Sequence, residues 1–203
     1  MTTFPLLLVF GFASLMPQAS SGQDALIYKA IIATTIRPEV VRMMGPRLTT
    51  EPVILVSDQT LAMCRLNFPP PKIGCIPEND IGPLEVPDRR QQLGFQGLLT
   101  AKARAELIVS FRDRNLRDHP FASTSLDNVI AVPADYRAET VQRESARTTG
   151  WSSFSTPAYS SDGHAVVYAS YVCGGLCGYA WLFLLEQRHD EWVVVRREVL
   201  WVS

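Results

Sequence analysis

Two sets of reactive side chains lie in the last quarter of the chain: Asp162 with His164, and Cys173 with Cys177. A histidine beside a carboxylate can serve as a general base, and Ser170 would complete a Ser-His-Asp arrangement. However, residues this close together on one strand do not normally converge, and the chain contains no Gly-x-Ser-x-Gly motif. We therefore expect no catalytic residue, and a small secreted hydrolase is the alternative to a non-catalytic protein.

The loop Cys173–Cys177 is compatible with a structural disulfide, a thiol redox pair or a metal site. A reactive thiol needs a nearby cation or helix start, and no Lys or Arg occurs between Arg147 and Arg188. Zinc would need two further ligands at close spacing, which this pattern does not offer. The sequence thus favours a disulfide over a thiol redox protein and predicts no metal and no cofactor. Possible ligand or site residues are the acid–histidine pair and two glycines that permit close backbone approach: Asp162, His164, Gly174 and Gly175.

The start of the chain has the features of a signal peptide. Residues Phe4–Met16 form an apolar run that is short for a membrane span, and no charged residue precedes Asp24. Small residues over Ala19–Gly22 offer a cleavage site. We therefore predict a signal peptide over residues 1–22 and a single domain over residues 23–203, exported to the periplasm or secreted. The alternative is an N-terminal buried helix or a membrane anchor.

An exported chain meets an oxidising compartment, where its four cysteines would pair. Three connectivities are possible. We predict Cys64 with Cys75 and Cys173 with Cys177, because each pair brackets a turn-rich loop. Closing such short loops contributes about 2–3 kcal/mol each, so the hydrophobic core must hold the domain together.

The charge balance argues against a nucleic-acid partner. Lys and Arg number 19 against 20 for Asp and Glu, and the net charge is −1. Binding by counterion release needs clustered basic residues, whereas pairs such as Arg196–Arg197 are typical of solvated faces. We expect an unknown protein or small-molecule partner, no nucleic acid, and no integral membrane segment after signal cleavage.

Periodicity and turn residues predict the elements that precede the reactive side chains. A helix is expected from Asp24 to Ile36, ended by Pro38, and a second helix over Leu98–Asn115 with Thr100 at its start. The other expected elements are a hairpin of Val53–Val56 with Thr60–Leu66, a loop over Asn67–Asp88, a strand over Asn128–Val132 and a helix over Asp135–Arg147.

The C-terminal part predicts three consecutive antiparallel strands over His164–Val172, Tyr179–Glu186 and Trp192–Val195, joined by tight turns. The fold class is therefore α+β: helices and short strands followed by a C-terminal antiparallel β-meander, without βαβ alternation or parallel strands. The stretch Tyr179–Leu185 is apolar on both faces, which predicts a central strand with helices on one side and a loop, partner or ligand on the other.

The C-terminal segment resembles a family of uncharacterised exported bacterial proteins. Those proteins end in an ALVYVSYxCGxLCGxG strand and loop, an LLEKxxGKW hairpin and a terminal LWxS. The matching residues here are Ala165–Tyr168, the cysteine loop, Leu184–Glu186, Trp192 and Leu200–Ser203, whereas Gln187–Glu191 replaces the usual Lys and Gly residues of the hairpin. The resemblance covers about the last fifty residues. It implies export and a C-terminal sheet, and it carries no catalytic residue.

The absence of catalytic motifs, set against an apolar sheet and a Pro-rich loop, favours an exported non-catalytic binding or interaction domain of unknown ligand. A small secreted hydrolase or a thiol redox protein is the alternative.

Overall fold

The computed structural model describes residues 21–45, 51–64, 75–85, 95, 97–121, 126–134, 148–174 and 177–203. The expected signal peptide, apart from its last two residues, and the expected helix Asp135–Arg147 lie outside these ranges. In chain order the elements are α1 (Ser21–Ile31), η1 (Ile32–Ile36), α2 (Arg37–Met44), β1 (Ile54–Ser57), β2 (Ala62–Met63), β3 (Cys75–Ile76), η3 (Glu78–Ile81), α3 (Gly82–Glu85), α4 (Ala101–Arg114), β4 (Val129–Val132), β5 (Trp151–Phe154), β6 (Ala158–Tyr159), β7 (His164–Gly174), β8 (Cys177–Arg188) and β9 (Glu191–Val202).

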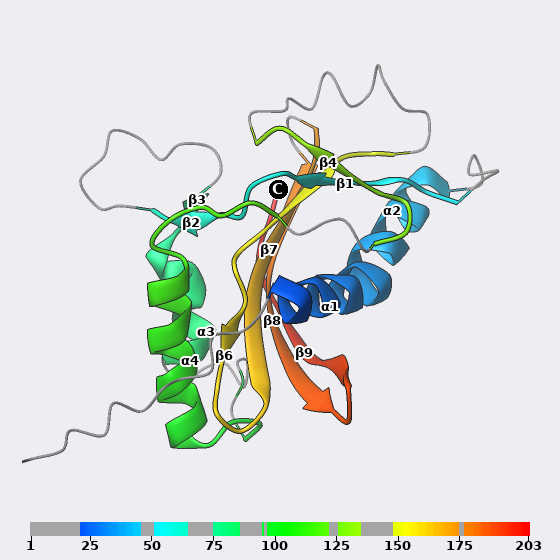
Figure 1. Ribbon diagram of the computed structural model, residues 1–203. Helices are drawn as coiled ribbons and strands as arrows, with labels where there is room; N and C mark the ends of the chain where they lie inside the picture. The colour runs from blue at the N-terminus through cyan, green and yellow to red at the C-terminus, as the bar shows by residue number, and fades with distance from the viewer. Residues whose placement is uncertain are drawn as a thin grey trace, which may run out of the picture.

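The fold is α+β, as predicted, and its centre is the C-terminal meander of β7, β8 and β9 (Figure 1). Within the described ranges the main sheet has the order β4-β1-β5-β7-β8-β9, with β6 also pairing with β7. Gly163 turns the chain into β7 with φ of 85°, a conformation that glycine adopts without strain. A two-residue turn over His189–Asp190 joins β8 to β9. Strands β8 and β9 are both longer than the strands predicted from the apolar runs in the sequence.

The expected hairpin after Glu51 is wrong, and so is the expectation of a sheet without parallel strands. Strand β1 is buried at all four positions and pairs in parallel with β4 on one side and β5 on the other. A strand buried on both faces is typical of the interior of a mixed or parallel sheet. The residues after β1 bond elsewhere instead: Thr60 N–H donates to the carbonyl of His119, and β2 pairs with β3.

The N-terminal helix does not end at Pro38 as predicted. Its third segment α2 runs on to Met44, and η1 forms a wide turn in which Arg37 N–H donates to the carbonyl of Ile32, five residues back. A proline inside a regular helix loses a hydrogen bond and collides with the carbonyl four residues before it. In the π-turn the hydrogen bonds run to the carbonyl five residues back instead of four. This wider turn lies just before Pro38 at the start of α2, so the chain stays helical.

The two faces of the sheet are covered by different helices (Figure 1). On one face, Trp181, Phe183 and Leu185 of β8 pack with apolar residues of α1, η1 and α2. On the other, Ala180, Leu182 and Leu184 of β8 pack with the buried stripe of α4, namely Ala103, Leu107 and Phe111. Strand β8 is therefore buried on both faces, as predicted for a central strand. The expectation that one face would be left to a loop, partner or ligand is wrong, because α4 with α3 occupies it.

A polar clasp joins the start of α1 to the end of α4. Asp24 accepts hydrogen bonds from the Tyr159 hydroxyl at 2.6 Å and from Arg114 at 3.0 Å, and the Arg114 guanidinium lies 5.0 Å from the centre of the Tyr159 ring. Burial raises the pKa of Asp24 more than these two partners lower it. The clasp thus holds a half-buried carboxylate whose ionised form depends on Arg114.

Replacing Arg114 by Met should destabilise the fold by about 1 kcal/mol at neutral pH, because it leaves Asp24 without its cation. Since the folded-state pKa of Asp24 lies above its unfolded value, ionising this group costs folding free energy as pH rises through that range. Without Arg114 the pKa rises further, so the loss should be larger at about pH 7 than at about pH 4. Urea unfolding at both pH values measures it, with Arg117→Met as the exposed control; equal losses at the two pH values would contradict the prediction.

Candidate functional site

The predicted acid–histidine pair forms a turn and does not build a catalytic triad. His164 Nδ1 lies 2.9 Å from Asp162 Oδ1, as a hydrolase would require. However, the Ser160 hydroxyl donates to the same carboxylate oxygen, and it accepts from the backbone N–H of His164. The carboxylate therefore stands between serine and imidazole, whereas nucleophile activation needs the imidazole between the other two groups. Ser170, which pairs with Ala180 in the interior of the meander, is not part of this cluster.

The same turn is fastened to α4 by Glu106. Its carboxylate accepts hydrogen bonds from the backbone N–H of Ser161 at 2.7 Å and from the Ser161 hydroxyl at 3.0 Å. These bonds lower the pKa of Glu106, the backbone bond contributing most. These hydrogen bonds together fix the β6–β7 turn, which gives the cluster a structural explanation.

Both predicted disulfides are confirmed, Cys64–Cys75 and Cys173–Cys177, with Cα atoms 5.0 Å and 5.1 Å apart. No free cysteine remains. Disulfides of this kind are typical of proteins in oxidising compartments. Gly174 ends β7 opposite Cys177, while Gly175 lies outside the described residues.

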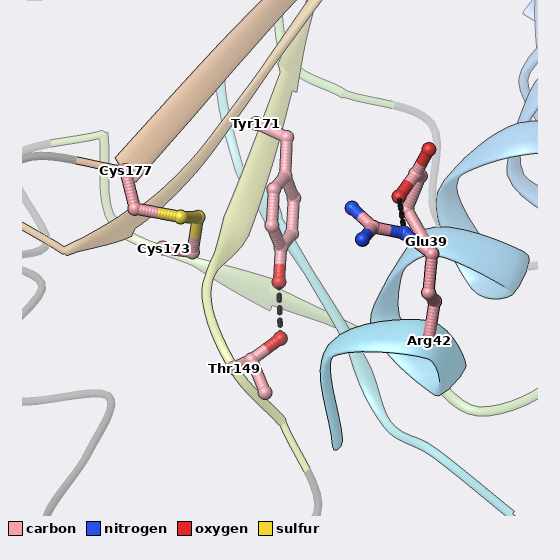
Figure 2. The surroundings of a disulfide bond; sticks show 6 residues. All are labelled: Glu39, Arg42, Thr149, Tyr171, Cys173 and Cys177. Atoms are coloured by element: carbon pink, nitrogen blue, oxygen red, sulfur yellow. Dashed lines mark hydrogen bonds and ion pairs between the residues drawn. A yellow bond between two sulfur atoms is a disulfide. The ribbon is translucent and has the colours of Figure 1, made fainter. Parts of the chain in front are cut away.

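The second disulfide joins the end of β7 to the start of β8, and no helix of the described residues begins at either cysteine (Figure 2). Beside it, the Tyr171 hydroxyl points to Thr149 Oγ1 at 2.6 Å, and burial raises the pKa of Tyr171 to about 12. The nearby Arg42 guanidinium points to Glu39, with Nε 2.8 Å from the carboxylate. Because the Arg42 guanidinium is paired with Glu39, it is not free to activate a thiol at Cys173 or Cys177.

Strand β9 is one edge of the main sheet, with β4 at the other, and it is twelve residues long. Ser203 exchanges both backbone hydrogen bonds with Gly178, and antiparallel pairs alternate between bonded and non-bonded positions. Register shifts at Val195 and Leu200 preserve this alternation. The residues that turn N–H and C=O away from β8 are therefore Trp192, Val194, Arg197, Val199 and Val202. In the described part of the chain, no hydrogen bond reaches these outward groups.

The second half of this edge is also exposed at its side chains. Val199 is 54% exposed and Val202 is 61% exposed, and Trp201 between them is 37% exposed. Arg197 is exposed and has no ion pair among the described residues, whereas Arg196 binds Glu198 at 2.7 Å. The outer edge of β9 thus offers backbone groups, apolar side chains and an unpaired cation together.

A shallow hollow of about 300 Å³ lies between η1 and β9, lined by Thr34, Thr35 and the stretch Val194–Arg197. Side chains along a strand point to the two faces of the sheet in turn. Because the hollow contacts four consecutive residues of β9, it cannot lie on one face alone and must follow the edge of the strand. The Thr34 hydroxyl donates to the carbonyl of Ala30. Thr35 is only 4% exposed.

Two backbone irregularities meet at this hollow: the π-turn of η1 and the β-bulge at Val195. Both kinds of irregularity are enriched at functional sites, where they redirect side chains. We define the β9 edge site as Arg197, Val199 and Val202 together with this hollow. None of its residues was predicted as a site residue, and Arg197 was assigned to a solvated face. The available signal was a basic pair inside a β-branched run near the end of the chain.

The described residues contain no group of three or more His, Cys, Asp or Glu that could hold a metal ion. None of the helices over those residues has the length and apolar character needed to cross a membrane. No family model matches the chain, and no curated protein or solved structure matches it significantly. The β9 edge site must therefore be interpreted from its own geometry.

Proposed function

We propose that this chain is an exported, non-catalytic interaction domain that binds an extended segment of another protein along β9. The observation that carries the proposal is the outer edge of β9, whose N–H and C=O groups have no partner among the described residues. An extended peptide can add to such an edge as a further strand, with affinity from backbone hydrogen bonds and specificity from alternate side chains. Export to the periplasm or beyond is supported by the apolar start of the chain and the two disulfides.

A second copy of the chain fits this edge less well than an extended segment of a partner. Antiparallel pairing of two β9 strands about Arg196–Arg197 would set like charges opposite each other, which is destabilising. The bulges at Val195 and Leu200 interrupt the edge, and bulges and edge charges both oppose sheet-to-sheet association. The uninterrupted stretch Arg196–Val199 remains available to a short segment.

The hydrolase alternative is disfavoured by the turn of Asp162 and His164, where the carboxylate separates serine from imidazole. The thiol redox alternative is disfavoured by the setting of Cys173–Cys177 in a strand-to-strand loop.

The proposal predicts a specific effect of Val199→Pro. The N–H of Val199 points outward, so proline there removes a docking donor and leaves the β8–β9 ladder intact, as edge prolines do. Peptides enriched from a random heptapeptide phage library on the purified chain, then resynthesised, should bind Val199→Pro at least about tenfold more weakly than the unaltered chain. Isothermal titration measures the affinities.

The matched control is Val199→Ala, which shortens the side chain and keeps the N–H donor. It loses only side-chain contact, so it should bind the same peptides at most about threefold more weakly than the unaltered chain, and circular dichroism should show both variants folded. Failure to enrich any peptide, or equal binding to Val199→Pro, would overturn strand addition at β9.

A further inference from the structure

We infer that the segment docked on β9 carries an acidic side chain, and that its carboxylate enters the hollow between η1 and β9. This inference rests on the proposed function and specifies the chemistry of the partner. The outward residues Val194, Arg197 and Val199 have their side chains on the sheet face covered by the N-terminal helix. They lie opposite residues of β8 that pack on this face, and directly paired residues of neighbouring strands share a face. A side chain of the docked strand opposite Arg197 on this face lies beside η1.

The hollow supplies the groups that a carboxylate needs. Arg197 offers a planar set of N–H donors and has no ion pair in the described ranges, and a guanidinium can bind both oxygens of a carboxylate. Thr35 also lines the hollow and carries a hydroxyl group. A threonine hydroxyl beside a guanidinium can donate a second hydrogen bond to a carboxylate oxygen.

The other residues around the hollow also favour a negatively charged ligand group. The Thr34 hydroxyl is already bonded to Ala30, and Arg196 is already paired with Glu198, so they line the hollow without offering a free charge. Glu198 is buried against Arg196, and the lining residues include no acidic side chain. The hollow therefore favours an anionic side chain over a neutral or cationic one. Its flanking contacts are with Val199 and Val202, which suit apolar or β-branched neighbours in the docked segment.

The test compares each enriched heptapeptide with a copy in which its Glu or Asp is changed to Gln or Asn. On the unaltered chain this change should weaken binding about tenfold, as expected for a charge-assisted hydrogen bond. Arg197→Met should remove the difference between the two peptides, and Thr35→Val, which keeps the side-chain shape, should reduce it about threefold. Arg117→Met removes the same charge from an exposed site at the end of α4 and should leave the difference intact.

The outcomes separate this inference from the proposed function. Peptides that require the N–H of Val199 but bind equally well in acidic and neutral form would overturn the acidic partner and leave strand addition standing. An acidic preference that survives Arg197→Met would also overturn it. Free glutamate added up to about a hundredfold excess should not displace the peptide, because the backbone pairing carries most of the affinity. Displacement by free glutamate would assign the hollow to a small carboxylate and contradict the protein segment.

Discussion

Replacing Trp181 by Ala should destabilise the protein by about 3–5 kcal/mol, the largest side-chain effect that we expect. Trp181 is 2% exposed in the middle of β8 and packs on the side covered by α1 and η1. Its ring stacks on Tyr179 with centroids 5.5 Å apart and lies 6.2 Å from the Phe183 ring. Truncation leaves a cavity that the paired strands on both sides of β8 cannot collapse to fill.

The control is Val199→Ala, because Val199 lies directly opposite Trp181 on β9 and yet is largely exposed. It should cost less than about 1 kcal/mol. Urea unfolding followed by far-ultraviolet circular dichroism gives both values. A loss below about 1 kcal/mol for Trp181→Ala would mean that β8 is not the buried centre of the sheet.

Gly150→Ala should destabilise the fold by about 3 kcal/mol through overpacking against backbone. A Cβ atom at Gly150 would lie 2.8 Å from the carbonyl carbon of Val172 and 2.9 Å from Cα of Cys173, with the Val172 oxygen nearer still. Backbone atoms next to the Cys173–Cys177 disulfide cannot move aside as a flexible side chain would. The expected result is a clear fall in the thermal unfolding midpoint without loss of the disulfide.

Gly82→Ala is the matched control, because a Cβ atom at Gly82 meets nothing within 4 Å and the backbone is already helical there. It should change the free energy of unfolding by less than about 1 kcal/mol, since alanine restricts the unfolded chain while its Cβ crowds the ring of the following Pro83. If Gly150→Ala behaved like Gly82→Ala, the close approach of the β5 start to the end of β7 would be incorrect.

The predictable parts of the fold are those that local signals encode. The strands of the meander follow from β-branched runs and tight turns, α4 follows from its apolar spacing and the Thr100 cap, and the cysteine pairs follow from turn-rich loops. The parallel pairs of β1 with β4 and β5 join residues far apart in the chain, and no local pattern specifies them. The helix past Pro38 depends on one wide turn, for which the sequence contains no distinct signal.

The candidate site was harder to predict than the fold. Asp162 and His164 lie in contact without Ser170, and the order of hydrogen bonds that makes their turn structural appears only in three dimensions. The exposure of β9 depends on which strand ends the sheet, and a sequence does not reveal this. Thr35 belonged to a predicted helix, and it became a candidate only because it lines the hollow together with Arg197.

Amide hydrogen exchange along β9 distinguishes a free strand edge from one paired with a docked segment. In the free chain, the outward N–H groups of Arg197, Val199 and Val202 should exchange rapidly, while the inward N–H groups of Glu198 and Trp201 should be protected by β8. On saturation with an enriched acidic heptapeptide, Arg197 and Val199 should become protected. Protection of these two amides in the free monomer, or its absence in the complex, would contradict strand addition at the edge of β9.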